Sequence, residues 1–186
     1  MAVLRPLVLG LGIAHTSLVM GAQNASGDRI DAGATKMLKS PDTAFAINAA
    51  QGGTAEVKMG KLAVEKASDP DVKAFGQQMI DDHTKANDQL ASVARQEYMT
   101  LPSELTAKDE AMYSRLEKLS GAAFDKAYVA GMLKDHEADL KEFEKEMRTG
   151  KDPNIKNFAA QTLPVLQDHL ERVKSIHSKI GGGSSM

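Results

Sequence analysis

The sequence predicts an all-α protein, built as an antiparallel four-helix bundle with one short accessory helix. Aromatic residues make up only 4% of the 186 residues and tryptophan is absent, a composition that favours helices over strands. At three places a capping residue precedes a proline suited to the first turn of a helix, namely Ser40-Pro41, Asp69-Pro70 and Asp152-Pro153. Four long helical stretches joined by short connections then indicate a bundle.

The boundaries of the expected helices follow from these caps and from the residues that end each helix. The first helix begins near residue 41 and the second near residue 70, and Leu101-Pro102-Ser103 closes the second. The accessory helix is expected over residues 106–119. A long helix over 122–148 ends at Thr149-Gly150, and the last runs over 153–179. We therefore expect one helical domain over residues 41–180 and a flexible tail over 181–186.

The first 22 residues have the layout of a secretory signal peptide. A short basic stretch precedes a mostly apolar run over residues 8–20, and Gly21 and Ala22 supply small residues for cleavage. A membrane anchor is the competing interpretation, but the run is too short and too weakly hydrophobic for one. We therefore expect a periplasmic or secreted protein after cleavage, with a flexible linker over residues 23–40.

Charge and cysteine content exclude several classes of function. The formal net charge is −2, and no basic run is present to hold nucleic acid or anionic lipid. Cysteine is absent, which removes disulfides, thiolate metal ligands and a cysteine nucleophile. No catalytic triad or nucleotide-binding motif is present. We expect neither a nucleic-acid partner nor a transmembrane span in the mature chain, and we assign no catalytic residue.

The dipeptide Asp-His occurs three times, each time within the same apolar frame. The copies are Asp82-His83, Asp135-His136 and Asp168-His169. Apolar residues lie four before, three before and seven after each histidine. At 100° per residue these positions surround the histidine on one face of a helix. Each of the three helices should therefore direct one imidazole into the core.

The first helix offers a carboxylate in place of a histidine. Glu56 shares its face with small and apolar residues, where an unpaired charge is costly. Each of these four side chains lies near the middle of its helix, so antiparallel packing brings Glu56, His83, His136 and His169 to one level. Three imidazoles and a carboxylate are a ligand set for a divalent transition metal, with zinc, copper, iron, manganese and nickel not distinguished.

Four aspartates are candidates to support this site. Asp82, Asp135 and Asp168 lie 100° round the helix from the histidines. There they either form surface ion pairs or orient a histidine of an adjacent helix. Asp139, one turn after His136, is the best-placed extra ligand.

Several motifs resemble a bacterial family of exported proteins of unknown function, often labelled predicted outer-membrane proteins. They occur in order within residues 43–178: the segment 45–57, then 72–83, 124–136 and 163–170. The resemblance implies export and a ferritin-like four-helix fold. It assigns no function.

Three classes of function remain open. The first is an exported metal-binding protein that serves in sequestration, buffering or a stress response. The second is a metal-free structural or envelope-stress module whose polar layer only fixes the register of the helices. The third is a ferritin-like oxidase or peroxide-scavenging enzyme. It is disfavoured because Ile80, Leu133 and Leu166 stand three residues before the histidines, where the di-iron pattern requires glutamate.

Overall fold

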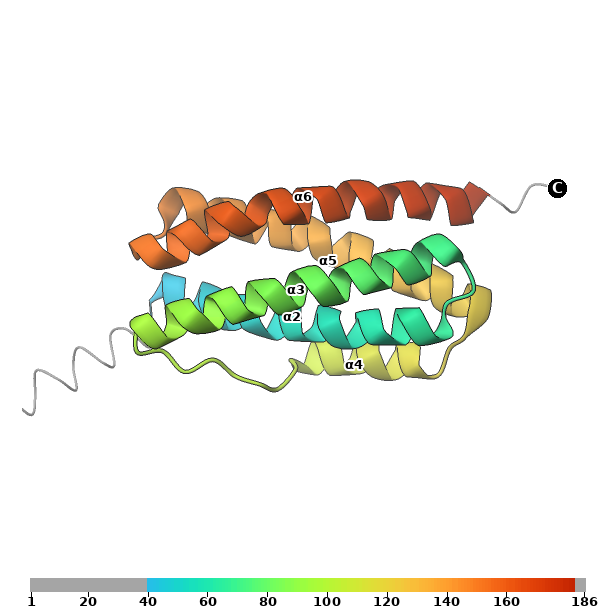
Figure 1. Cartoon of the computed structure of the whole chain (residues 1–186), viewed down its shortest axis with the longest axis horizontal. Coiled ribbons are helices and arrows are strands. Elements are labelled where there is room, and N and C mark those ends of the chain that lie inside the picture. The colour runs from blue at the N-terminus through green and yellow to red at the C-terminus, as the bar shows by residue number, and fades with distance from the viewer. Residues whose placement is uncertain (1–39, 183–186) are drawn as a thin grey trace, which may run out of the picture.

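The computed structural model describes residues 40–182, and within this range the chain forms five helices and no strand (Figure 1). In chain order they are α2 (Pro41–Lys66), α3 (Pro70–Gln96), α4 (Ala107–Glu117), α5 (Gly121–Thr149) and α6 (Pro153–Gly182). The predicted all-α class is confirmed. The expected signal peptide, the linker up to residue 39 and residues 183–186 of the expected tail lie outside the described residues.

The three predicted capping residues act as expected at the helix starts. The Ser40 hydroxyl accepts a hydrogen bond from the backbone N–H of residue 43 at 3.0 Å, and the Asp69 carboxylate accepts one from residue 71 at 2.7 Å. Asp152 does the same for residues 154–155. The last helix continues beyond its expected end to Gly182, because glycine weakens a helix by only about 1 kcal/mol and does not by itself end one.

The four long helices are joined by two short turns and one crossover. In Figure 1, α2 and α6 run in one direction along the bundle, while α3 and α5 run in the other. Because α3 ends at the opposite end from where α5 begins, residues 97–120 carry the chain back along the outside. Helix α4 lies within this segment, alongside α2, rather than across the bundle. The expectation of short connections throughout is therefore wrong at this one place, and a single crossover is typical of ferritin-like bundles.

A polar layer divides the apolar core into two clusters. One cluster, which includes Phe75 and Val173, fills the half of the bundle near the α2–α3 turn. The other, which includes Phe45 and Phe143, fills the half near the α5–α6 turn. The layer between them consists of buried polar side chains, one from each long helix: Glu56, His83, His136 and His169.

Helices α2 and α3 approach each other most closely at two glycines. A Cβ atom added to Gly60 would lie 2.7 Å from the carbonyl oxygen of Gly76, and one added to Gly76 would lie 2.6 Å from the Cβ of Ala63. Any side chain at either position would therefore push the two backbones apart. By contrast, a Cβ atom added to Gly52, which also lies on α2, would meet no atom within 4 Å.

Each of the two short turns is held by an aspartate from the other helix pair. Asp125 on α5 accepts hydrogen bonds from the backbone N–H groups of residues 68–69 in the α2–α3 turn, both at 3.0 Å. Asp42 at the start of α2 accepts them from residues 151–152 in the α5–α6 turn, at 2.8 and 2.6 Å. Both aspartates are buried, so these hydrogen bonds are shielded from water.

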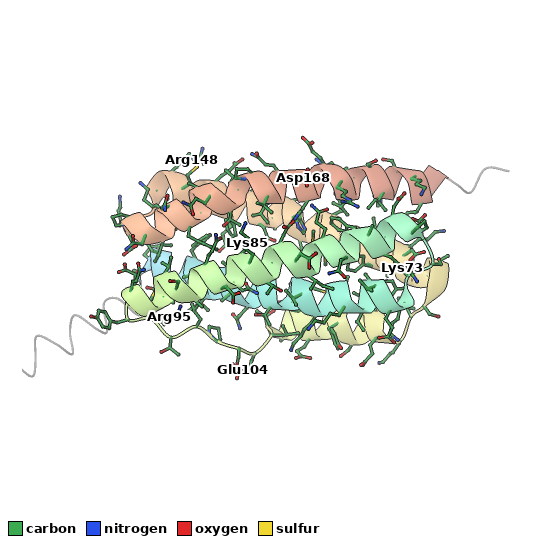
Figure 2. All side chains as sticks on the ribbon, viewed as in Figure 1. Lys73, Lys85, Arg95, Glu104, Arg148 and Asp168 are labelled. Carbon is green, nitrogen blue, oxygen red and sulfur yellow. The ribbon has the colours of Figure 1, made fainter. Side chains whose placement is uncertain are left out.

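Charged side chains of both signs lie on the outward faces of the bundle. Figure 2 shows this for Lys85 on α3, Arg148 on α5 and Asp168 on α6, all of which are exposed. No helix among residues 40–182 is both long and apolar enough to cross a membrane.

Candidate metal centre

The four side chains predicted to converge do meet in the polar layer. The Nδ1 atom of His83 lies 3.0 Å from Glu56 Oε2, and the Nε2 atom of His136 lies 3.3 Å from Nδ1 of His169. One ring nitrogen from each histidine can be chosen so that all three lie within 4.8 Å of one another. The antiparallel arrangement thus brings mid-helix residues of α3, α5 and α6 to one place, next to Glu56 of α2.

The facing nitrogens of His136 and His169 both present lone pairs. The other nitrogen of His136 donates to the backbone carbonyl of Met132 at 2.9 Å, and that of His169 donates to Asp82 Oδ2 at 2.8 Å. A neutral imidazole carries one N–H, so neither ring has a second proton for the 3.3 Å contact between them. Two lone pairs at this separation repel each other unless a proton or a metal ion lies between them. The spacing is also that of two nitrogens on one tetrahedral zinc, about 3.3 Å for Zn–N bonds near 2.05 Å.

The third ring has an unused nitrogen as well. His83 directs Nδ1 to Glu56, and its Nε2 is buried with no hydrogen-bond partner among the described residues. The same is true of Glu56 Oε1, which lies 3.6 Å from His136 Nδ1. Glu56 therefore lies beside the Nδ1 atoms of His83 and His136, and the Nε2 atom of each ring is left to bind another group. In this position it orients His83, which is the usual role of a carboxylate behind a metal-binding histidine.

The charge states of the layer suit a cation. Burial raises the pKa of Glu56, but the three nearby histidines lower it further, to about 2, so this carboxylate is ionised. Burial lowers the pKa of His136, and it lowers that of His169 to about 4 although the hydrogen bond from His169 to Asp82 acts to raise it. These two rings are therefore neutral near pH 7, the form that binds metal. Burial also disfavours the protonated form of His83. The negative charge and the hydrogen bond of Glu56 have the larger effect, so the pKa of His83 is raised.

The three aspartates that precede the histidines have three different partners. Asp82 on α3 contacts His169 of the adjacent helix α6, as one of the two interpretations expected. Asp135 pairs with Lys108 of α4 at 2.7 Å, and the exposed Asp168 accepts a hydrogen bond from Gln78 at 3.0 Å. The latter two lie away from the imidazoles and stabilise helix contacts at the surface.

Asp139, the expected extra ligand, lines a small cavity beside the histidines together with Glu56 and His83. Two further neighbours of the site could not be predicted from the sequence. One is the carbonyl of Met132, which holds His136; the other is the ring of Phe75, whose centroid lies 6.3 Å from those of His136 and His169. Neither a backbone acceptor nor an apolar ring can be identified as part of a site from the sequence alone.

Comparison with known proteins identifies the family and the fold. The family model described as "Domain of unknown function (DUF4142)" matches residues 28–176. Among solved structures, the crystal structure of a candidate secreted protein, DUF305, from Streptomyces coelicolor is similar to this bundle with a TM-score of 0.66. The two sequences are 12% identical, and the match covers 77% of this chain and 94% of that chain. At this identity the likeness shows the fold alone. No curated protein matches the chain.

Proposed function

The chain belongs to the DUF4142 family, in agreement with the resemblance carried by its motifs, and we propose that its bundle binds one divalent transition-metal ion through His83, His136 and His169. The ligand atoms are Nε2 of His83, Nε2 of His136 and Nδ1 of His169. Glu56 and Asp82 hold the rings from behind. The observation that carries this proposal is the 3.3 Å contact between two ring nitrogens whose rings each direct the other nitrogen to an oxygen acceptor.

A three-histidine set leaves a fourth position for water. Imidazole ligands suit zinc, copper, nickel and iron, and they exclude magnesium and calcium, which prefer oxygen. The physiological role that follows is sequestration or buffering of a transition metal. With cleavage of the expected signal peptide near residue 22, this takes place in the periplasm or outside the cell.

Thermal unfolding tests the metal site directly. A metal that binds only the folded chain stabilises it by about 4 kcal/mol at a thousandfold excess over Kd, and this raises the melting temperature of a bundle of this size by about 10 °C. Zn²⁺ should therefore raise the melting temperature of protein purified without a histidine tag and stripped with chelator, while Mg²⁺ at the same concentration should not. The gain should fade below about pH 6, as protons compete for the imidazoles.

Two histidine variants provide the matched comparison. His136→Ala should abolish the gain with Zn²⁺, whereas His177→Ala, which changes an exposed histidine on α6, should retain it. A wild-type melting temperature that does not respond to Zn²⁺, Cu²⁺ or Ni²⁺ would contradict the proposal. So would a His136→Ala protein that melts lower than wild type by the same amount with and without metal. That result would identify the layer as a metal-free structural element.

A further inference from the structure

An enclosed cavity of about 40 Å³ lies beside the three-histidine centre, between α2, α3, α5 and α6. A single water needs roughly 10–15 Å³ by this measure, so the cavity has room for an ion with one or two waters. Its wall includes three carboxylates, those of Glu56, Asp139 and Glu142. The amide side chains of Asn48 and Asn87 line it as well.

Negative charge on this wall exceeds positive charge. His83 is the one lining residue that can carry a positive charge, and it is paired with Glu56. Glu142 is held at the rim, where its carboxylate accepts a hydrogen bond from Asn48 at 3.0 Å. Burial raises the pKa of Asp139 to about 8, and the negative charges of Glu56, Asp135 and Glu142 add to the rise while Lys108 opposes it. Asp139 therefore holds a proton near pH 7, and a divalent cation bound here would displace this proton.

Two further features supply oxygen atoms for such a cation. Glu56 is 4% exposed, and its Oε1 atom has no hydrogen-bond partner among the described residues. Gly53 leaves room for the amide of Asn87, because a Cβ atom at this glycine would lie 2.3 Å from Asn87 Oδ1. A larger residue at position 53 would thus displace the amide from the cavity wall. Carboxylate and amide oxygens, with water, are the ligands of hard divalent cations.

We propose that the carboxylate cavity, formed by Glu56, Asn87, Asp139 and Glu142, is a second cation site for a hard divalent ion such as Mn²⁺. Its ligands are oxygen atoms instead of imidazole nitrogens, and they belong to other residues of the helices. Glu56 provides a buried carboxylate ligand and Asp139 a partly buried one, Asn87 provides a neutral oxygen, and Glu142 stands at the rim. The site goes beyond the proposed function, since it needs no imidazole ligand, and it shares with the histidine centre only Glu56, which pairs with His83.

Binding of Mn²⁺, followed by the electron paramagnetic resonance signal of the free ion, tests this site. The full mature chain carrying one equivalent of Zn²⁺ should bind one equivalent of Mn²⁺. Asp139→Asn should weaken Mn²⁺ binding by at least about tenfold, because a charged ligand is lost. Glu137→Gln, which removes an exposed carboxylate on the same helix, should leave it unchanged. Asparagine matches the shape of aspartate, and far-UV circular dichroism checks that the variant is folded.

His136→Ala separates this proposal from the one for the histidine centre. This variant should lose Zn²⁺ binding and keep Mn²⁺ binding. If wild-type protein binds Mn²⁺ but no transition metal, the carboxylate cavity stands and the histidine centre fails. If one equivalent of Zn²⁺ displaces the Mn²⁺, both ions use the histidine centre and the second site is overturned. Equal Mn²⁺ affinity of wild type and Asp139→Asn would overturn it as well.

Discussion

The three aspartates beside the histidines differ in what they do to the imidazoles. The Asp82 carboxylate accepts the N–H of His169 Nε2 at 2.8 Å, which fixes the ring orientation and leaves Nδ1 free for a metal. Asp168 has the same position in its Asp-His pair but lies exposed against Gln78. Only the first of these carboxylates is in a position to affect metal affinity.

Replacing each of these two aspartates by asparagine gives a matched test at the residue scale. Asp82→Asn should weaken Zn²⁺ binding by about 10- to 100-fold, the usual effect of removing a carboxylate behind a metal-binding histidine. Asp168→Asn should change the Kd by less than about twofold. Isothermal titration calorimetry of the two variants measures both values. Equal Kd values for Asp82→Asn and wild type would mean that His169 is not a ligand.

The sequence predicted the inward face of each histidine but not the partner of each aspartate. The first depends on the helical period alone, so Val72, Leu90 and similar apolar residues were sufficient to orient His83. The second depends on which helix lies beside the aspartate. Asp82 faces α6, whereas Asp135 faces α4, whose path no local pattern in the sequence fixes.

At the scale of elements, the contact between α2 and α3 decides how tightly the site is enclosed. Gly60 and Gly76 bring the two backbones together within the same half of the bundle as Met79, one turn before His83. Glycine inside a helix costs about 1 kcal/mol relative to alanine, so its presence at both positions is explained by the close approach and not by helix formation.

Alanine substitutions at Gly76 and Gly52 should therefore have opposite effects on stability. Gly76→Ala places a Cβ atom 2.6 Å from that of Ala63 and should lower the free energy of unfolding by about 2 kcal/mol, since the helices must separate. Gly52→Ala meets no atom within 4 Å and should raise it by up to about 1 kcal/mol, through better helix propensity. Urea unfolding of the two variants measures both. A stabilised Gly76→Ala protein would show that the close approach is not required.

The crossover is the part of the fold that the sequence could not provide. Proline and capping residues marked where helices begin, and these starts were correct to within one residue. Residues 97–120 carry turn residues and a short amphipathic helix that are compatible with several paths around a bundle. The path is selected by packing between segments far apart in the chain, such as the contact of Gln51 with the carbonyl of Glu104 at 3.2 Å.

At the scale of the whole molecule, His169 should cost metal-free protein stability as the pH falls from 6.5 toward 4. The ordinary histidine pKa is 6.5, and that of His169 is lowered to about 4 in the fold, first by burial and then by the positive charges of His83 and His136. Between these values the unfolded chain binds a proton that the folded chain does not, so stability is full above pH 6.5 and declines below it. Asp139 acts in the opposite direction, because its pKa is raised from 3.8 to about 8 and the folded chain gains stability as it takes up this proton. The raised pKa of His83 also opposes the loss, but only above pH 6.5.

Urea unfolding of metal-free protein at pH 7 and pH 5 measures this effect. His169 alone should account for a loss of about 2 kcal/mol over this interval, and the lowered pKa of His136 adds to it. His169→Gln should remove that share of the loss, whereas His177→Gln should not. Equal changes in stability between the two pH values for His169→Gln and wild type would contradict the burial of a neutral imidazole at position 169.

The aspartates that hold the two turns have a consequence for how the chain folds. Asp125 closes the α2–α3 turn from α5, and Asp42 closes the α5–α6 turn from α2, so neither helix pair can satisfy its own turn. A separated pair would leave these backbone N–H groups to water and its apolar core face exposed. The two helix pairs therefore stabilise each other, and unfolding should be one cooperative transition in which neither pair persists alone.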